Sequence, residues 1–225
     1  MRSERTVHQD SGGDRPDVPM GRQLSAAAAV QRLCGERGWR SCLVGGLAVL
    51  RWGRPRPTED VDLLVEAGHG VAGEMAQALF GCFEPRSADA HRFAVDHRIA
   101  QLWAGERVAV DVALGTSRRL RRTMDRASWW ESTGPRLLTC SAEDLIVNKA
   151  ISDRERDWHD VAGIVERQGA RLDRELILRE FGPVRTQGHH LGDPLAQLND
   201  HGDGAAVARL RQALTTTDRL VVDHG

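Results

Sequence analysis

The feature that most constrains the fold is a short apolar segment, Asp60–Val65, that carries two aspartates. Its length and alternation predict a β-strand in which Asp60 and Asp62 lie on one face while Val61 and Leu63 lie on the other. A carboxylate in such a strand is costly to bury unless it is paired or bound to a metal. The segment therefore predicts a sheet with two functional carboxylates side by side.

A third carboxylate, Asp111, lies in the apolar run Val108–Leu114, which predicts a neighbouring strand. Two aspartates at i and i+2, completed by a third from another strand, can hold two Mg²⁺ ions about 3.5–4 Å apart, the arrangement that phosphoryl transfer needs. We therefore predict Asp60, Asp62 and Asp111 as metal ligands and catalytic residues. The alternative for Asp111 is a solvent-facing residue at a strand edge.

Two consecutive glycines, Gly45 and Gly46, stand between a predicted strand (Trp39–Val44) and a predicted helix (Leu47–Trp52). Without side chains there, backbone N–H groups can approach a phosphate, assisted by the N-terminus of the helix. A plain tight turn is the other interpretation.

The remaining pattern predicts an α+β fold, with a mixed sheet of about five strands flanked by helices and a helical C-terminal part. An antiparallel meander is expected from three strand-like runs, His91–Val95, Arg98–Trp103 and Arg107–Leu114. Helices are expected at Gln23–Arg37, Val71–Leu79, Ser141–Ile151, around Trp158, at Asp173–Phe181 and at Ala205–Leu214. We divide the chain into a disordered leader (1–20), a catalytic core (21–134) and a helical part closing the nucleotide cleft (135–225).

Composition limits the partners. A formal net charge of −1 over 225 residues argues against a globally basic nucleic-acid binder, so any basic surface is local. The densest basic run holds Arg118, Arg119, Arg121, Arg122 and Arg126, which could contact an RNA backbone or simply form a solvated helix. The longest apolar stretches are too short to span a bilayer, and the N-terminus has no apolar signal region, so we expect a cytoplasmic protein without a membrane partner.

Lys149 is the single lysine among 31 basic residues. A compact ammonium suits a crowded phosphate and metal site better than a planar guanidinium does. We predict a catalytic or nucleotide-binding role for it. A solvated helical lysine, left by chance in an arginine-rich chain, is the alternative.

Together these motifs resemble a known signature. A Gly-Gly pair followed after thirteen residues by Asp60-Val61-Asp62, with a later strand acid, is similar to the DNA polymerase β-like nucleotidyltransferase superfamily. The finer pattern, Gly45-Gly46-Leu47-Ala48 and Arg56-Pro57-Thr58, resembles the AbiEii-type branch, the toxins of type IV toxin–antitoxin (abortive infection) systems. That branch also has a lysine followed about eight residues later by an aspartate, as Lys149 is by Asp157.

The resemblance implies a magnesium-dependent nucleotidyltransferase that transfers NMP from an NTP to an acceptor hydroxyl. It implies that Gly45, Gly46, Arg56 and Thr58 hold the triphosphate, while Lys149 and Asp157 line the nucleotide cleft. The branch further implies a toxin that modifies RNA, such as the 3′ end of a tRNA, and a separately encoded cognate antitoxin.

Two rival interpretations stay open. An antibiotic-modifying nucleotidyltransferase shares the superfamily motif but acts on a small hydroxylated drug. A nucleotide-binding module that has lost catalysis is a different class altogether, although retention of all three acids argues against it.

Overall fold

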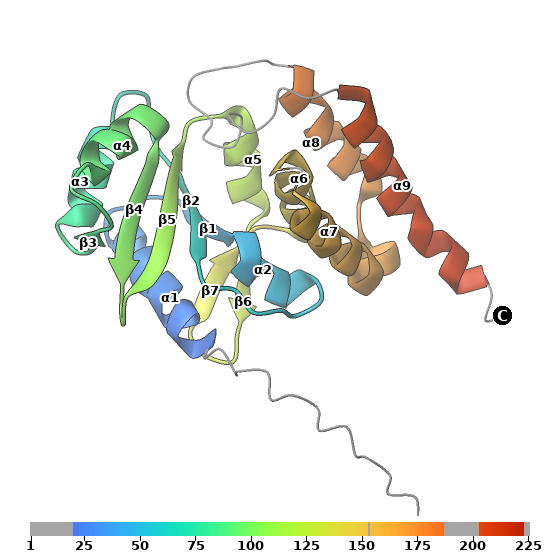
Figure 1. The fold of residues 1–225 in the computed structure, drawn as a ribbon, viewed down its shortest axis with the longest axis horizontal. Helices are drawn as coiled ribbons and strands as arrows, with labels where there is room; N and C mark the ends of the chain where they lie inside the picture. Colours follow the sequence, from blue (N-terminus) through green and yellow to red (C-terminus); the bar gives the residue numbers. More distant parts are fainter. Residues whose placement is uncertain (1–19, 153, 187–202, 223–225) are drawn as a thin grey trace, which may run out of the picture.

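The computed structural model describes residues 20–152, 154–186 and 203–222, where the chain forms one mixed seven-stranded sheet with helices around it (Figure 1). The strands are β1 (Ser41–Val44), β2 (Val61–Glu66), β3 (Glu84–Pro85), β4 (Ile99–Ala104), β5 (Val108–Gly115), β6 (Ser128–Glu131) and β7 (Arg136–Thr139). Their order across the sheet is β3-β4-β5-β2-β1-β7-β6. The predicted leader lies outside the described residues except for Met20, which begins the first helix.

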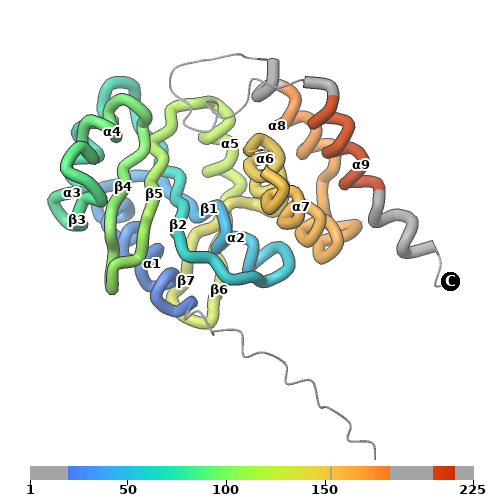
Figure 2. Tube along the Cα trace, viewed as in Figure 1, coloured from blue at the N-terminus to red at the C-terminus, as the bar shows by residue number. Residues whose placement is uncertain are grey.

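The apolar acid-bearing strand, β2, occupies the centre of the sheet. It pairs antiparallel with β1 and parallel with β5. On the far side of β1, β7 runs parallel to it although almost a hundred residues separate them in the chain, as the tube trace shows (Figure 2). The predicted antiparallel pairing of the two runs after Arg98 is confirmed in β4 and β5.

Nine α-helices and one 3-10 turn (η1, Gly169–Arg171) lie within the described ranges. The α-helices are α1 (Met20–Glu36), α2 (Gly45–Trp52), α3 (Ala72–Phe80), α4 (Ala90–His97), α5 (Arg118–Arg126), α6 (Ala142–Ser152), α7 (Glu155–Gln168), α8 (Arg174–Thr186) and α9 (Asp203–Val222). Helices α6 to α9 form the half of the molecule on the right of Figure 1, whereas α3 and α4 lie at the opposite end of the sheet.

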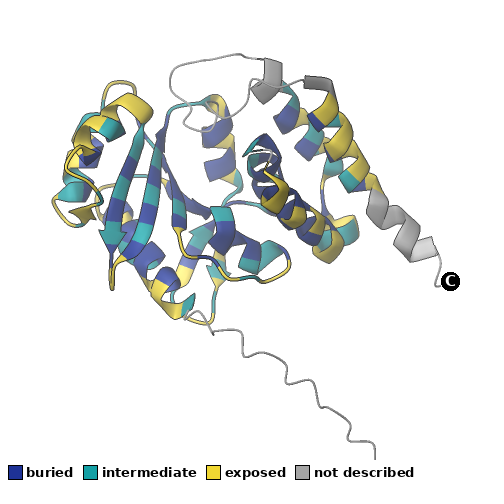
Figure 3. Ribbon diagram, viewed as in Figure 1, coloured by how far each residue is buried: buried dark blue, intermediate teal, exposed yellow. Residues whose placement is uncertain are grey.

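The two faces of the sheet belong to two apolar cores, because side chains alternate along each strand. One core joins Val61 and Leu63 of β2 to α1, α3 and α4. The other joins Leu64 of β2 to α2, α5 and the helical half, including Trp158 and Val161 of α7, where a helix was expected. Figure 3 shows this alternation of buried and half-buried residues along the strands.

The predicted α+β class is confirmed, but some elements differ. The sheet has seven strands rather than about five. The expected strand at His91–Val95 is wrong: this run belongs to α4, which buries Ala90 and Ala94 one helical turn apart. The β6–β7 hairpin was not expected, and through β7 the sheet continues past Pro135, the predicted boundary of the core. None of the helices in the described ranges is long and apolar enough to cross a membrane.

Candidate active site

Two of the three predicted acids lie directly opposite each other in the centre of the sheet. Asp62 on β2 and Asp111 on β5 are register partners in the parallel pair, and both side chains are half-buried. Asp60 immediately precedes β2 and is exposed. The structure therefore brings Asp62 and Asp111 together in neighbouring strands, with Asp60 two residues from Asp62. We call these three residues the acidic site.

The Gly-Gly turn packs against the acidic site. Gly45 has a positive φ of 65°, and a Cβ atom there would lie 1.8 Å from Oδ2 of Asp62. A Cβ atom on Gly46 would lie 2.4 Å from Oγ1 of Thr58. Both positions exclude a side chain, and Gly45 also needs the backbone freedom of glycine. The backbone N–H of Gly46 donates a hydrogen bond to Asp62, so the start of α2 already holds one negative group.

Negative charge is crowded at the acidic site. Burial raises the pKa of Asp62, and the charges of Asp111 and Asp60 raise it further, against the opposing effect of Lys149. Burial also raises the pKa of Asp111, although the nearby Arg86 guanidinium works in the other direction. Each shift means that the ionised form costs more here than in water. A cation bound from outside would relieve that cost.

Two residues that the sequence did not indicate hold Asp111. Nη1 of Arg86, just after β3, lies 2.8 Å from Oδ1 of Asp111, and Nε2 of Gln101 on β4 donates to the same oxygen at 3.3 Å. Gln101 is the register partner of Asp111. The backbone N–H of Arg86 donates a hydrogen bond to the carbonyl of Gln101. No local pattern marks Arg86, since its contact with Asp111 depends on how the edge strand β3 pairs with β4.

Lys149 belongs to a buried ion-pair cluster, which we define as Arg56, Lys149, Asp157 and Asp160. Its Nζ lies 2.7 Å from Oδ1 of Asp157 and 2.9 Å from Oδ2 of Asp160, and only 7% of the residue is exposed. Arg56 donates two hydrogen bonds of 2.6 Å to the carboxylate of Asp160. Ser152 and Arg154 complete the partners of Asp157.

This cluster joins the loop before β2 to the helical half. Burial acts to raise the pKa of Asp157 and of Asp160, but hydrogen bonds from Lys149 and Arg56 outweigh it and leave both values lowered. The charge of Lys149 also lowers the pKa of Asp62, so it acts on the acidic site. The structure thus brings Lys149 and Asp157 together, and it adds Asp160 as a second acid bonded to Lys149.

The residues predicted to hold a triphosphate are engaged within the protein. Arg56 uses Nε and Nη2 on Asp160, and its Nη1 donates to the carbonyl of Pro57. Thr58 is buried, and its hydroxyl donates to the carbonyl of Asp60 at 3.4 Å. Both therefore shape the loop that delivers Asp60 and Asp62 to the sheet.

The arginine run does not form the solvent-facing stripe expected from the sequence. Arg119 is buried and bonds to Asn148 of α6, while Arg121 pairs with Glu66. Arg122 grips Glu180 of α8 through hydrogen bonds of 2.8 and 2.7 Å.

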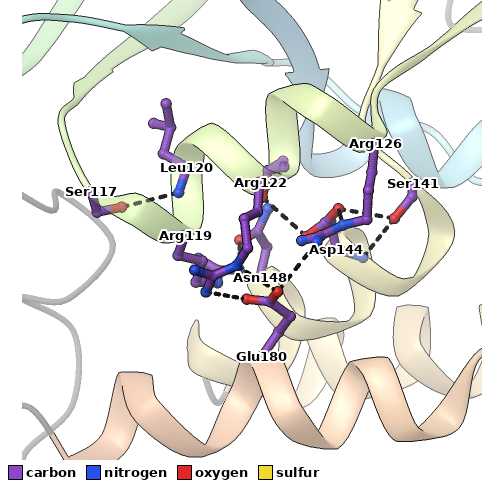
Figure 4. Close-up of polar contacts among 10 residues, drawn as sticks. Ser117, Arg119, Leu120, Arg122, Arg126, Ser141, Asp144, Asn148 and Glu180 are labelled. Atoms are coloured by element: carbon purple, nitrogen blue, oxygen red, sulfur yellow. Dashed lines mark hydrogen bonds and ion pairs between the residues drawn. The ribbon is translucent and has the colours of Figure 1, made fainter.

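Its last member, Arg126, makes bonds of 2.8 and 2.7 Å to the buried Asp144 of α6 and reaches Glu180 at 3.2 Å. Figure 4 shows these side chains pointing from α5 into the helical half. We call the contacts of Arg119, Arg122 and Arg126 the α5 clamp. The sequence revealed the charges of this run but not their partners.

In the described residues, the candidate metal-binding side chains do not lie around one common point. Within residues 20–152, 154–186 and 203–222, no group of three His, Cys, Asp or Glu side chains has an arrangement that could hold a metal ion. Oδ1 of Asp111 accepts hydrogen bonds from both Arg86 and Gln101, so it points toward these two side chains. The chemistry of the donors nevertheless fits Mg²⁺, because carboxylate oxygens are its preferred protein ligands and their charge here is under-compensated.

A mixed sheet that sets paired aspartates against a glycine turn has the organisation of a nucleotidyltransferase. The sequence profile of one such family, described as nucleotidyl transferase AbiEii toxin of the Type IV TA system, matches residues 40–219, and the chain belongs to this family. The family predicted from the motifs is thereby confirmed, and the protein is a nucleotidyltransferase.

Solved structures give only distant similarities. An antigenic nucleotidyltransferase-like protein from Paracoccidioides brasiliensis is 17% identical, with 92% of this chain and 89% of that chain covered and a TM-score of 0.46. The antibiotic-resistance factor ANT(2'')-Ia is 14% identical, with coverages of 73% and 91% and a TM-score of 0.42. A tRNA-processing enzyme is 14% identical over 92% of this chain and 59% of its own, with a TM-score of 0.32. A search of curated proteins finds no match.

Proposed function

We propose that this nucleotidyltransferase is magnesium-dependent, transfers NMP from an NTP to a hydroxyl group of RNA such as tRNA, and acts as the toxin of a type IV system with a cognate antitoxin. The family supports the transfer reaction and the toxin–antitoxin context. The ions, the acceptor and the toxic effect are the parts that we propose here.

One observation carries the proposal: Asp62 and Asp111 are register partners in adjacent parallel strands, and both have raised pKa values. Carboxylates are normally kept apart or paired when they are partly buried. A pair that is under-compensated, with Asp60 beside it, is a suitable binding place for divalent cations. Asp60, Asp62 and Asp111 would hold two Mg²⁺ ions, which supply charge neutralisation for the reacting phosphate when bound.

The chain's residues would then divide the work across the acidic site. The acceptor oxygen forms a bond to the α-phosphorus, the bond from that phosphorus to the bridging oxygen breaks, and pyrophosphate leaves. The proton of the acceptor hydroxyl passes to Asp111, which is the acid on the β4 side of the site. The start of α2 would orient the α-phosphate next to Asp62, because Gly45, without a Cβ atom, lets the backbone lie directly against that carboxylate.

The nucleotide side would lie toward the helical half. Lys149 is one of the two cations of the buried ion-pair cluster, its charge already reaches Asp62, and it would stabilise the triphosphate from there. Asp157 and Arg56 hold the cluster in place, and Gly46 and Thr58 keep the loop against α2. In this proposal 21–134 supplies the acids and 135–225 closes the nucleotide cleft.

The deciding experiment offers the protein a choice of acceptors. Wild-type protein is incubated with Mg²⁺ and each α-³²P-labelled NTP, together with either total cellular RNA or a panel of small hydroxylated antibiotics. We expect label in RNA, dependent on Mg²⁺ and lost with EDTA. Label in a small compound but not in RNA would overturn the RNA acceptor in favour of drug modification. No transfer to any acceptor, despite NTP binding, would favour a module without catalysis.

A further inference from the structure

The sheet face that bears the acidic site is covered unevenly. Over β1 and β2, this face is packed against α2, α5 and the helical half, and Cys42 and Leu64 are buried. Over β4 and β5, the same face presents Gln101, Trp103 and Ala109, which are only half-buried, while the alternate residues are buried on the other face. In Figure 1 no labelled helix crosses in front of β4 and β5.

On this open face, the ring of Trp103 lies close to the guanidinium groups of two arginines, Arg86 and Arg107. Cζ of Arg86 lies 5.5 Å from the ring centroid of Trp103, and Cζ of Arg107 lies 4.9 Å from it. Arg107 also pairs with Glu84 at 3.2 Å, but both side chains are more than half exposed, so this pair is weak. We call Trp103, Arg86 and Arg107 the Trp103 platform.

The platform adjoins the acid on the β4 side of the site. Trp103 lies two residues from Gln101, the register partner of Asp111, and therefore on the same face of β4 at a spacing of about 7 Å. Arg86 belongs to both places, because its Nη1 bonds to Asp111 while its guanidinium faces the Trp103 ring. A molecule stacked on Trp103 would thus reach Asp111 without crossing the helical half.

We infer that the Trp103 platform receives the unpaired 3′ end of the RNA acceptor, with a base stacked on Trp103 and a phosphate held by Arg107. Aromatic rings flanked by guanidinium groups are the surface that single-stranded nucleic acid prefers, since every base has a π-face and every nucleotide a negative charge. The α5 run is less suited to this role, because Arg119 and Arg122 bond to side chains of α6 and α8 and hold α5 against the helical half. The inference rests on the proposed function.

A binding measurement without NTP tests the platform directly. A 5′-fluorescein single-stranded RNA oligonucleotide is titrated with full-length protein, and anisotropy is followed over a range of salt concentrations. Trp103→Ala should weaken binding at least about fivefold, the lower end expected for the loss of one stacked base. Arg107→Ala should weaken binding and reduce the slope of log K against log salt by about 0.7, the value for one single-strand phosphate contact.

The chain offers a matched control at the far end of the sheet. Trp129 on β6 is exposed, and Arg136 on β7 lies over its ring at 4.7 Å, so Trp129→Ala and Arg136→Ala remove the same two groups elsewhere. These controls should bind RNA as the wild type does. If Trp103→Ala binds no more weakly than Trp129→Ala, the platform is not the RNA site.

Two further outcomes separate this inference from the proposed function. Binding that depends on Trp103 in a protein that transfers no NMP would support the platform and refute catalysis. Transfer of NMP to RNA at the wild-type rate by Trp103→Ala, with unchanged RNA affinity, would refute the platform and leave the proposed function intact. Circular dichroism and NTP binding should be unchanged in Trp103→Ala, because its ring lies on the half-buried face.

Discussion

The carboxylates of the acidic site and those of the helical half differ in how much positive charge surrounds them. Burial raises the pKa of Asp62 and of Asp111. Burial also acts on Asp144, Asp157 and Asp160, yet hydrogen bonds from arginine or lysine reverse its effect and leave their pKa values lowered. The ionised form of a partly buried aspartate is thus disfavoured at the acidic site and stabilised in the helical half.

This difference separates function from architecture. In the helical half, an arginine-rich chain supplies each buried acid with a cation. The resulting pairs join α5 to α6 and α8 (Figure 4) and α6 to α7. At the acidic site Asp111 is bonded to one cation, Arg86, and to the neutral amide of Gln101, while Asp62 accepts a backbone hydrogen bond and is influenced by the charge of Lys149. Acids that a protein leaves short of counter-charge are candidates for binding a cation from solution.

The largest effect should come from the acidic site. Asp62→Asn removes a charge that the proposal assigns to metal binding, and we expect NMP transfer to fall by about 10³-fold or more. The free energy of unfolding should not decrease, because the change relieves repulsion with Asp111. Transfer is measured with labelled NTP, and stability by urea unfolding.

An exposed acid provides the control for this change. Asp96 on α4 is exposed and lies away from the acidic site, so Asp96→Asn should alter neither rate nor stability. Near-normal transfer by Asp62→Asn in the presence of Mg²⁺ would remove Asp62 from the catalytic residues and weaken the contrast between the two sets of acids.

The next effect should be on stability, in the helical half. Asp144 is 1% exposed and accepts hydrogen bonds from Arg126, Thr123 and Ser141. Asp144→Ala should lower the free energy of unfolding by about 3 kcal/mol, since it leaves buried donors without their acceptor. In contrast, Glu131→Ala breaks an exposed pair with Arg136 and should cost less than about 1 kcal/mol. Equal losses in urea unfolding would show that the α5 clamp is not a stabilising element.

A smaller effect on rate is expected at the link between the two regions. Lys149→Arg keeps the charge but places a planar fork where a compact ammonium fits between Asp157 and Asp160. We expect a loss of about tenfold or more in transfer, with retained secondary structure by circular dichroism. Wild-type turnover by this variant would mean that the single lysine of the chain reflects composition and not chemistry.

The centre of the fold was predictable because local signals coincide there. Alternating apolar residues define β2 and β5, and the acids they carry stand out against that pattern. The strand expected at His91–Val95 failed because a run of five residues fits a strand or a short helix equally well, and packing of Ala90 and Ala94 decides for the helix. The strands of the β6–β7 hairpin have only four residues each, too few to give a periodic signal.

The partners of charged groups were less predictable than the charges themselves. Arg122 and Glu180 are 58 residues apart, and Arg56 and Asp160 are 104 residues apart, so no local spacing reveals either pair. Lys149 and Asp157 are only eight residues apart on consecutive helices, and there the sequence was informative. A run of arginines indicates positive charge, but only the fold decides whether it faces solvent or a buried acid.

The smallest expected effect has opposite signs in the two regions and depends on pH. Hydrogen bonds from Arg122 lower the pKa of Glu180, so its contribution to stability is present above the ordinary glutamate pKa and is lost as the pH falls through the lowered value. Asp62 has a raised pKa, so its cost is present above that raised value and is relieved as the pH falls through it toward the ordinary aspartate pKa.

Glu180→Gln should therefore be less stable than wild type at pH 7, with the difference shrinking in acid. Asp62→Asn should be more stable than wild type at pH 7, and that difference should also vanish as the pH falls. Urea unfolding of the three proteins at several pH values between 7 and the acid limit of folding provides the measurement. Differences of the same sign for both variants at pH 7 would contradict the contrast between a pair kept for structure and an acid kept for binding.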